Sequence, residues 1–418
     1  MVTCPVPVIP REFHIKGMAA LRGGTPARPT HLSPLRDSTK TARRSVVVIG
    51  AGAFGGWSAL QLQRKGAKVL LVDAWGPGNS RASSGGETRI IRATYGPAQI
   101  YTEMAARALR LWHENEERWG SKLLFRTGVL WMAGSDSSYE HASIPLLTQA
   151  GVRFEQLSTS ECARRWPQIN FDGIFWGIYE PDSGYLLARR SCEAVLNAFV
   201  REGGEYRQAH IVPGLITANR FEGILIAPGE MLEADAYVFA CGPWLGKIFP
   251  FLESRITPTR QEVFFFGTAP GDSRFTDAQL PTWIDFGQRF YGIPGNERRG
   301  LKVADDRRGV SVDPTSMERV VSNEALAAAR SYVDLRFPEM RGAPLVESRV
   351  CQYENSLDQN FLLDRHPEAQ NTWIVGGGSG HGFKHGPVVG EMVSDAVLQL
   401  KAPPAEFALA RLLKNSDH

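Results

Sequence analysis

Short hydrophobic runs alternate with segments of helical amphipathic spacing along most of the chain, a pattern typical of mixed α/β proteins. Residues 46–73 show it best, because the apolar runs 46–49 and 69–72 flank a segment with helical spacing. Other runs predict strands at 88–92, 123–133, 171–179, 206–212, 223–226, 236–241, 261–266, 289–293, 360–363 and 373–375. Helices are expected at 101–119, 185–202, 325–332 and 388–400.

Three glycines follow the first apolar run directly. Gly50, Gly52 and Gly55 have the GxGxxG spacing, and Asp73 ends the second run, 21 residues beyond Gly52. In a strand–turn–helix unit, the first glycine permits the tight turn, the second lets the backbone approach a pyrophosphate, and the third lets the helix pack against the strand. An acid after the second strand can accept hydrogen bonds from ribose hydroxyls. This context predicts a bound dinucleotide rather than an ordinary glycine-rich turn.

The length of 418 residues exceeds what one hydrophobic core usually supports, so two domains are expected. The texture changes to alternating strands at about 256–350, before a glycine cluster and a final helix. We therefore expect a dinucleotide-binding fold that is interrupted by a second domain, inserted in pieces. Residues 1–44 are rich in Pro, Arg, Ser and Thr and are expected to form a disordered leader. An inert extension is favoured over a transit peptide there.

Charge and cysteine usage exclude several classes of protein. Residues 1–45 carry a net charge of +6, so the rest of the chain, at −3, is nearly neutral and offers no nucleic-acid surface. No apolar run is long enough for a transmembrane helix. The five cysteines are widely separated and form no CxxC pair, which favours a reducing, cytoplasmic location without a zinc site.

Cationic residues beside buried segments indicate an anionic ligand. Arg89 and Arg92 flank two isoleucines, and Lys384 follows a glycine cluster at 376–382 that precedes a predicted helix. Such charges usually have an anionic partner, and a substrate carboxylate is one candidate. Surface charges at the ends of helices and strands are the alternative. The glycine cluster, like Gly242 after an apolar strand, suits a backbone that lies against a cofactor.

The segments VVVIGAGAFGG, SGGETRIIRATYG, RVCQYENSLDQNFLLDRHP and GGGSGHGFKHG resemble, in order and spacing, those of the monomeric sarcosine oxidase family of FAD-dependent amine oxidases. The resemblance covers residues 45–400. It implies a Rossmann-like FAD-binding domain (45–124, 185–250 and 346–418) and an inserted, discontinuous α+β substrate domain (125–184 and 251–345). The second domain is expected to be built on an antiparallel sheet.

The resemblance also implies which residues hold the cofactor. FAD is expected, often attached through a cysteine to the flavin 8α position, and the cysteine in the matching motif is Cys351. Without the resemblance, a buried small hydrophobe is the simpler interpretation of this residue. The residues expected to contact FAD are Gly50, Gly52, Ala53, Phe54, Gly55, Asp73, Ala74, Ser84, Thr88, Arg89, Val212, Gly242, Trp244, Cys351, Gly378, Gly380, Gly382, Phe383 and Lys384.

By the same resemblance, Arg92 and Lys384 would bind the substrate carboxylate. Arg89 and Lys302 would face the flavin, where a lysine in this family activates oxygen. Tyr291, Tyr353, Asp306 and Gly380 would line the substrate pocket. The implied reaction is oxidation of a secondary amino acid by hydride transfer to flavin N5, followed by reoxidation with O2 to H2O2. The enzyme is expected to be a monomer that acts on a small molecule.

Two positions depart from the sarcosine oxidase pattern. Gly85 and Asp306 stand where that family carries histidines. We expect the loss of two imidazoles to enlarge the site, and the carboxylate of Asp306 to pair with a polar or cationic substituent. Larger N-substituted amino acids, glycated (fructosyl) amino acids and cyclic imino acids are therefore open alternatives to sarcosine. A dehydrogenase that passes electrons to another acceptor, and a flavin-binding subunit without turnover, are further alternatives.

Overall fold

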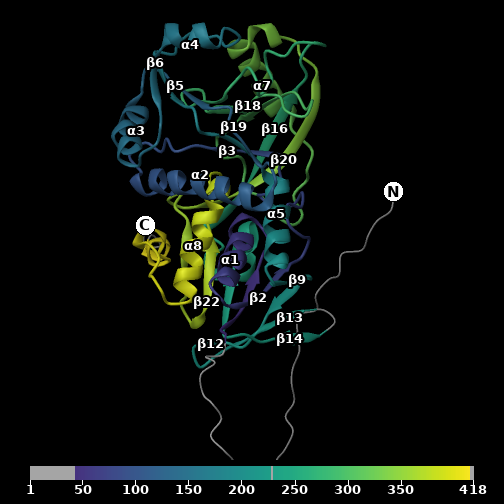
Figure 1. Ribbon diagram of the computed structural model, residues 1–418. Helices are drawn as coiled ribbons and strands as arrows, with labels where there is room; N and C mark the ends of the chain where they lie inside the picture. Colours follow the sequence, from purple (N-terminus) through teal and green to yellow (C-terminus); the bar gives the residue numbers. More distant parts are fainter. Residues whose placement is uncertain (1–42, 227–228, 415–418) are drawn as a thin grey trace, which may run out of the picture. The chain divides into compact units, whose positions relative to one another are not determined.

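The computed structural model describes residues 43–226 and 229–414, which contain two large β-sheets (Figure 1). Residues 1–42, nearly all of the expected leader 1–44, lie outside the described residues, as does Cys4. The helices and strands form a mixed α/β fold with several sheets. The described residues form one compact unit.

The first large sheet has six strands and is almost entirely parallel. Its order is β21 (Leu362–His366), β22 (Ala369–Gly376), β15 (Ala236–Phe239), β1 (Ser45–Ile49), β2 (Lys68–Asp73) and β9 (Glu205–Gln208). Only β21 runs antiparallel to its neighbour in this sheet. The central strand β1 is buried on both faces, as a continuous apolar run in a parallel sheet predicts.

Alternate residues of β1 point into different hydrophobic clusters. Val46 and Val48 pack with residues of α1 (Ala53–Arg64), α5 (Ala188–Arg201) and α8 (Gly386–Val397). Val47 and Ile49 face the other side of the sheet. That side is covered by the small strands β10 (Ile211–Pro213), β11 (Ile216–Thr217), β12 (Arg220–Phe221), β13 (Ile224–Ile226) and β14 (Glu230–Leu232), and by η1 (Gly242–Trp244), α6 (Leu245–Ile248) and η2 (Pro250–Leu252).

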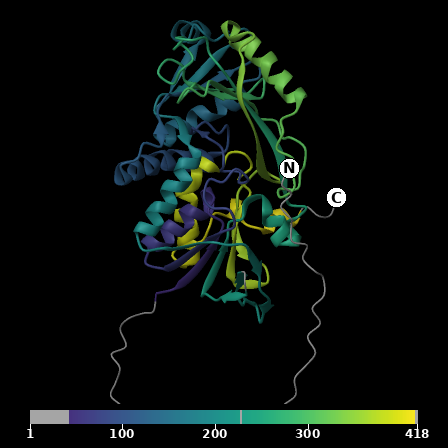
Figure 2. The same ribbon diagram turned by 90° about the vertical axis from the view of Figure 1, so that its right-hand side faces the viewer.

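The second large sheet has eight strands. Its order is β20 (Leu345–Ser356), β16 (Ile256–Phe266), β19 (Leu301–Asp305), β18 (Phe290–Ile293), β17 (Thr282–Asp285), β5 (Val129–Ala133), β7 (Trp176–Glu180) and β6 (Glu155–Ser158). All neighbours pair antiparallel except β17 and β5, which are parallel. Figure 2 shows α7 (Asn323–Arg336) along this sheet. Its other helices are α3 (Ser138–Gln149), α4 (Thr159–Arg165) and η3 (Pro338–Met340).

A small three-stranded sheet has the order β3 (Thr88–Ile91), β8 (Gly184–Leu187) and β4 (Leu124–Phe125). The long helix α2 (Gln99–Trp119) crosses the molecule between the two large sheets (Figure 1). Near the end of the chain come η4 (Phe383–His385), η5 (Ala405–Phe407) and α9 (Ala410–Leu413). β3 carries Arg89 and is followed directly by Arg92, η4 carries Lys384, and β3 and η4 are in contact.

The structure differs from the sequence prediction at β8. A helix was expected over 185–202, but residues 184–187 form a strand and the helix α5 begins at Ala188. Tyr185, Leu186 and Leu187 are all buried, because β8 pairs with β3 on one side and β4 on the other. Three consecutive buried apolar residues suit a central strand better than one face of a helix.

β20 also bears on the expected domain limits. It begins at Leu345 and pairs along its whole length with β16 of the eight-stranded sheet. Residues 346–356 were expected to belong with the FAD-binding segment 346–418. Because the strand carries Cys351 and Tyr353, this pairing makes the eight-stranded sheet the support for that motif.

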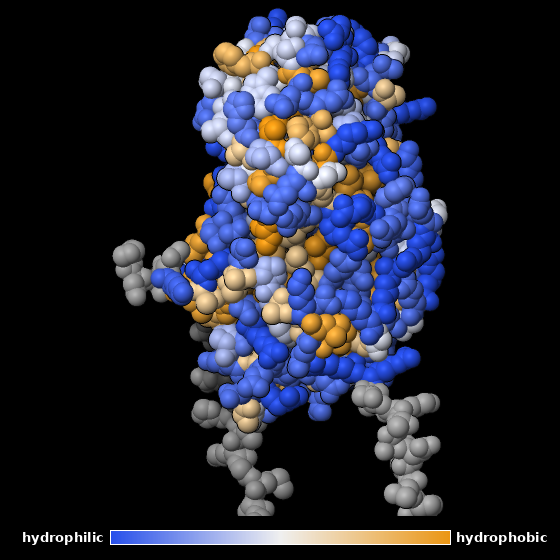
Figure 3. Space-filling view, turned by 60° about the vertical axis from the view of Figure 1, so that its left-hand side comes forward, coloured by the Kyte–Doolittle hydropathy of each residue, from blue (hydrophilic) through white to orange (hydrophobic). Residues whose placement is uncertain are grey.

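The surface in Figure 3 is mainly hydrophilic, with hydrophobic residues in small separate groups. Single exposed apolar side chains are ordinary on a protein surface. None of the helices formed by residues 43–226 and 229–414 combines the length and the apolar character needed to cross a membrane.

Candidate active site

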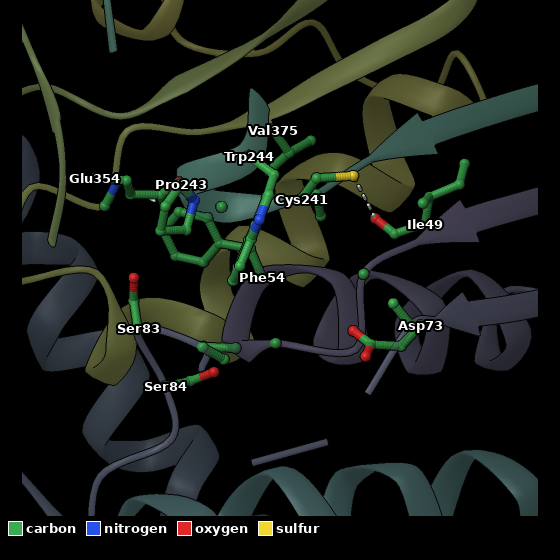
Figure 4. A pocket seen from close by; sticks show the side chains of 18 of the residues that line it. Ile49, Phe54, Asp73, Ser83, Ser84, Cys241, Pro243, Trp244, Glu354 and Val375 are labelled. Carbon is green, nitrogen blue, oxygen red and sulfur yellow. Dashed lines mark hydrogen bonds between the residues drawn. The ribbon is translucent and has the colours of Figure 1, made fainter. Parts of the chain in front are cut away.

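The glycine loop after β1 forms the floor of a cavity of about 300 Å³ (Figure 4). Gly50 has φ +105°, and a Cβ there would lie 2.3 Å from the Ala240 carbonyl oxygen. A Cβ at Gly55 would lie 1.8 Å from the Gly50 oxygen. No other residue fits either place, so the loop is held tight against β15 and α1, as the motif predicts.

Asp73 lies at one end of this cavity, and Ser83 and Glu354 lie towards the other (Figure 4). The Asp73 carboxylate accepts backbone N–H groups of Ala51 at 2.7 Å, and of Trp75 and Gly76 at 2.8 Å. These bonds fix the carboxylate at the end of β2, beside the start of α1. The position is suited to contact with a ribose that adjoins the glycine loop.

Most residues that the sequence predicts for FAD line this cavity. They are Gly50, Gly52, Ala53, Phe54, Asp73, Ala74, Ser84, Arg89, Gly242, Trp244, Gly378, Gly380, Gly382 and Phe383. Gly55 acts through the loop packing described above. Val212 does not line the cavity: its side chain is half-exposed, and the neighbouring Ile211 and His210 line it instead. Thr88 is buried next to Lys302, and Cys351 lies in β20.

Two residues that line this cavity have a buried polar atom without a hydrogen-bond partner within the described residues. These atoms are Ser83 Oγ and Glu354 Oε2. A buried polar group without a partner is costly, so a ligand with polar groups would stabilise this site. Together with the glycine loop and Asp73, these atoms fit a dinucleotide cofactor such as FAD. No cluster of His, Cys, Asp and Glu suited to a metal ion occurs in residues 43–226 and 229–414.

A second cavity, of about 690 Å³, adjoins the first. Arg89, Tyr353, Gly380 and Phe383 line both cavities. Arg92, Tyr291, Asp306 and Lys384 line the second, as the sequence analysis expected of the substrate pocket. A ring at the junction would therefore face the second cavity from the first.

Arg92 and Lys384 bring two positive charges to the second cavity. The Arg92 guanidinium lies 4.1 Å from the centroid of the Tyr95 ring and 4.8 Å from that of the Trp131 ring, and it donates to the Thr94 carbonyl. Lys384 Nζ donates to the Tyr95 hydroxyl and to the His381 carbonyl, both at 2.9 Å. Neither cation forms an ion pair with any carboxylate in the described part of the chain.

The electrostatic setting of Lys384 shows the cost of this arrangement. Burial and the nearby Arg92 charge lower the pKa of Lys384 well below its usual value. The Tyr95 hydroxyl is also 2.8 Å from His385 Nε2, and burial lowers the pKa of His385 well below its usual range. A carboxylate in the cavity would offset the repulsion between the two cations. The pair is therefore suited to contact with an anionic group.

Asp306 supplies the opposite charge in the same cavity. Its side chain is accessible from the cavity but surrounded by protein, and this desolvation raises the pKa of its carboxyl although Arg92 and Lys384 oppose the shift. Among the described residues, Asp306 forms no ion pair with Arg92 or with Lys384. The cavity thus presents a cationic and an acidic side, as expected for Asp306.

The expectation that the missing side chain of Gly85 enlarges the substrate pocket was wrong. Gly85 lines neither cavity, and a Cβ there would lie 1.9 Å from the Asn79 carbonyl oxygen. The absence of a side chain at residue 85 therefore allows close packing of its loop and creates no space in the second cavity.

Lys302 lines neither cavity, and it contacts Thr88, which precedes Arg89 in β3. It is 2% exposed, and its Nζ donates to the Thr88 carbonyl at 3.0 Å and to Thr88 Oγ1 at 3.3 Å. Burial, together with the charge of Arg89, lowers the pKa of Lys302 to about 7. The ammonium is therefore easily deprotonated, and a nearby negative charge would restore it.

Cys351 stands two residues before Tyr353 in β20, so their side chains leave the same face of the strand. Tyr353 lines both cavities. Cys351 also interacts with Arg89. Burial lowers the pKa of Arg89, but its interactions with Cys351, Tyr291 and Tyr353 raise it, and the net shift is upward. The thiol is free and half-buried, and Cys351 lines neither cavity.

The structure adds several aromatic and polar residues that the sequence analysis missed. Trp75 packs on Trp244, with ring centroids 4.9 Å apart, at the Asp73 side of the first cavity. The second cavity gains Tyr95, Tyr101, Trp131, Tyr139, Phe286, Arg289 and His381. Tyr95 follows Arg92 by three residues in the TRIIR segment, which is a signal that could have been used. Trp131 and Phe286 come from β5 and the end of β17, and no local pattern marks them.

A dinucleotide cavity joined to a cavity with two unpaired cations defines a cofactor-dependent enzyme site rather than a simple nucleotide-binding module. Residues 45–396 match the model of the DAO family, described as FAD dependent oxidoreductase. The chain belongs to this family of FAD-dependent oxidoreductases.

Curated relatives are oxidases of N-methyl amino acids. Monomeric sarcosine oxidase from Bacillus sp. (strain B-0618) is 31% identical over 374 residues, which are 84% of this chain and 92% of that protein. N-methyl-L-tryptophan oxidase from Salmonella arizonae is 28% identical over 381 residues, covering 89% of this chain and 99% of that protein. The predicted membership of a sarcosine oxidase-like family of FAD-dependent oxidoreductases is confirmed. The prediction that the protein is an oxidoreductase is confirmed as well.

Solved structures share the fold. L-proline dehydrogenase from P. horikoshii superposes with a TM-score of 0.78 and 20% identity, covering 89% of this chain and 98% of that one. Fructosyl amine:oxygen oxidoreductase (Amadoriase I) from Aspergillus fumigatus gives a TM-score of 0.75 and 20% identity, covering 91% and 92%. At these identities the likeness establishes the mixed α/β fold of FAD-dependent oxidoreductases.

Proposed function

We propose that this protein is an FAD-dependent oxidase of secondary amino acids, with an N-substituted or cyclic amine nitrogen next to a carboxylate-bearing carbon. In this proposal the six-stranded sheet is the Rossmann-like FAD-binding domain, and the eight-stranded sheet belongs to an inserted substrate domain. FAD occupies the first cavity, and the substrate occupies the second. The likeness to oxidases of sarcosine and N-methyltryptophan supports the class of substrate.

One observation carries the proposal: Arg92 and Lys384 face the second cavity without a carboxylate partner in the described residues. Lys384 is 4% exposed, and maintaining a buried charge without a partner is costly. A substrate carboxylate between the two groups would accept charge-assisted hydrogen bonds from both. The carbon next to that carboxylate would then be held towards the junction of the cavities.

FAD, when bound, takes up a hydride equivalent from the substrate carbon and delivers the electrons to O2, which is reduced to H2O2. The protein's task is to position the reacting C–H bond and to exclude competing water. Tyr291 and Tyr353, whose hydroxyls are 3.5 Å apart, border the place where that carbon would lie. Burial raises the pKa of Tyr291 to about 12 and raises that of Tyr353 well above its usual value, so both are neutral. Hydrolysis of the imine product yields a carbonyl compound and a free amine.

Lys302 supplies the charge for the oxygen step in this proposal. Its ammonium is buried beside Arg89 and held by Thr88, near the junction. A developing anion on reduced oxygen would be stabilised by such a preorganised charge in a water-poor site. Arg89, which lines both cavities, is the second positive group at the junction.

The size and polarity of the second cavity favour substrates larger than sarcosine. A cavity of about 690 Å³ is in the range that holds drug-sized ligands, and sarcosine would fill a small part of it. Asp306 and Arg289 add polar groups away from the carboxylate-binding pair. An N-substituent with hydroxyl groups, as in fructosyl amino acids, would use them. The shared fold with fructosyl amine oxidases is consistent with this second candidate.

We also propose that Cys351 forms a thioether to FAD. Two observations support this proposal: Cys351 shares its face of β20 with Tyr353, which lines both cavities, and it interacts with Arg89, which also lines both. We propose a reducing, cytoplasmic location, because the four described cysteines are free. We also propose that the enzyme acts as a monomer.

The proposal is tested by mixing the purified protein with candidate amines without oxygen and recording the visible spectrum. N-methyl, cyclic and fructosyl amino acids should bleach the flavin absorption, and admission of air should restore it with formation of H2O2. Bleaching by none of them would rule out an amine oxidase, and would favour a flavin-binding subunit without turnover. Bleaching without H2O2 in air would instead favour a dehydrogenase with another electron acceptor.

A further inference from the structure

The side chain of Glu354 is a buried acid that the reaction above does not use. It follows Tyr353 in β20, is 8% exposed and lines the first cavity. Its Oε1 accepts the backbone N–H of Gly378 at 3.1 Å. Its Oε2 has no hydrogen-bond partner among the described residues. One oxygen of the carboxyl therefore holds the loop at Gly378, and the other oxygen is left without a partner among the described residues.

Glycines border the free oxygen. A Cβ added to Gly376 would lie 3.4 Å from Oε2, and a Cβ added to Gly242 would lie 3.5 Å from it. Because these residues have no side chains, no protein group can reach Oε2 from β22 or from η1. Glu354 and Gly242 both line the cavity that the glycine loop forms, whereas Gly376 does not. Glu354 lies at the end of this cavity away from Asp73 (Figure 4).

No cation neutralises Glu354. The titratable group that faces it is the Cys241 thiol in front of η1, and burial raises the pKa of that thiol, with Asp73 and Glu354 adding to the shift. Its partner on β16 is Pro258, and the loop at 376–378 contributes backbone only. No ion pair to Glu354 occurs within residues 43–226 and 229–414. Burial raises the pKa of Glu354 to about 7, although the N–H groups of Gly378 and Gly377 oppose the shift.

We propose that Glu354 binds the cofactor as a neutral carboxylic acid, with Oε1 holding the Gly378 loop and the Oε2 hydroxyl donating a hydrogen bond to an acceptor atom of FAD. This inference rests on the proposal that FAD occupies the first cavity. FAD brings two negatively charged phosphates into that cavity and displaces water, and both effects favour the protonated acid. A carboxylate would place a second negative charge there without a counter-ion, whereas the acid satisfies both of its oxygens.

The inference predicts that FAD binding takes up a proton above about pH 7. The test uses a Cys351→Ser background so that FAD can be removed, and measures the FAD Kd of the apoprotein by fluorescence quenching between pH 6 and pH 9. With Glu354 present, Kd should rise by up to about tenfold per pH unit in the upper half of this range, since one proton is bound with FAD. Glu354→Gln should remove that slope, because the amide donates at every pH.

The variants also differ at pH 6. Glu354→Gln should bind FAD within about threefold of the parent, since it keeps an acceptor for Gly378 and a donor for FAD. Glu354→Leu, which keeps neither, should bind about tenfold or more weakly. The control Glu347→Gln changes another β20 glutamate, which pairs with Arg299 and Arg349, and should leave Kd and slope unchanged. Lys302 also titrates near pH 7, so the decisive quantity is the slope lost in Glu354→Gln.

Either of two results would overturn the inference. An equal pH slope in the parent and in Glu354→Gln would mean that Glu354 takes up no proton and merely clamps the Gly378 loop. A Glu354→Gln variant as weak as Glu354→Leu at pH 6 would mean that FAD presents a donor to a carboxylate. If the parent apoprotein binds no FAD at all, the proposed function itself fails, which is a different outcome.

Discussion

Lys384 Nζ and the Tyr95 hydroxyl are 2.9 Å apart, and the guanidinium of Arg92 lies over the ring of the same tyrosine. One aromatic side chain therefore holds both cations of the second cavity in place. The Tyr95 hydroxyl accepts a hydrogen bond from Lys384 Nζ, while the face of the ring attracts the guanidinium of Arg92. This shared support keeps the two basic groups close together before any anion arrives.

We expect Arg92→Met to raise KM by about 30-fold or more, corresponding to about 2 kcal/mol for a lost charge pair with the substrate carboxylate. Steady-state kinetics with the best amine substrate provide the measurement. Arg365→Met is the matched control, because Arg365 lies over the Trp373 ring and outside both cavities. An unchanged KM in Arg92→Met would place the carboxylate elsewhere.

Cys351→Ser should abolish covalent attachment of FAD. After acid precipitation, the yellow colour of the parent should stay in the pellet, and that of the variant should move to the supernatant. Cys162→Ala, at a buried cysteine of α4, should behave like the parent. A yellow supernatant from the parent protein would mean that FAD is bound without a thioether.

Lys302→Met should slow the reaction of the reduced enzyme with O2 by about 100-fold or more, because a preorganised charge is lost. In the parent, the rate constant should fall as pH rises, since the pKa of Lys302 is lowered to about 7 and deprotonation removes the charge. The negative charge of the reduced cofactor would move this midpoint upwards. Stopped-flow mixing with oxygenated buffer at several pH values measures both effects. A variant that keeps the parent's pH dependence would assign the oxygen step to another group.

Asp306→Asn should alter the choice of substrate more than turnover. We expect kcat/KM for amino acids with a hydroxylated or cationic N-substituent to fall about tenfold or more, because a charge-assisted hydrogen bond is lost. The value for sarcosine should change little. Asp305→Asn serves as the control, since Asp305 pairs with Arg307 and does not line the second cavity. Equal losses for both substrates would show that Asp306 does not discriminate between N-substituents.

A buried ion pair joins β17 to α7, and its loss should destabilise the fold. Arg336 Nε donates to Asp285 Oδ2 at 2.6 Å, and both side chains are at most 3% exposed. Arg336→Met leaves a buried carboxylate unpaired, so the free energy of unfolding should fall by about 3–5 kcal/mol. Arg153→Met, in an exposed pair with Asp182, should cost less than about 1 kcal/mol. Urea titration followed by fluorescence compares them. A loss of under about 1 kcal/mol in Arg336→Met would contradict the prediction.

The local part of this site could be predicted from the sequence. Gly50, Gly55 and Asp73 lie within one strand–helix–strand unit, so their spacing in the sequence predicts how they are arranged in space. Arg92 and Lys384 lie far apart in the chain and meet only because β3 and η4 approach. Their common role came from a family resemblance, and the cavity that both line supports it.

Other features depend on packing that no local pattern encodes. The strand β8 was predicted as a helix, because three apolar residues in a row suit either element and only pairing with β3 and β4 decides. Gly85 was interpreted as open space, although the Asn79 carbonyl fills the position of its missing side chain. Glu354 was passed over altogether, since an acid next to a recognised motif gives no sign of being buried.

The order of strands in the six-stranded sheet has a consequence for biosynthesis. β15 is paired between β1, from the start of the described chain, and β22, at residues 369–376. A nascent chain therefore exposes one edge of β15 on the ribosome until nearly the whole polypeptide has been translated. Premature stop codons anywhere before residue 369 should yield products with an open sheet edge, prone to aggregation and to removal by proteases.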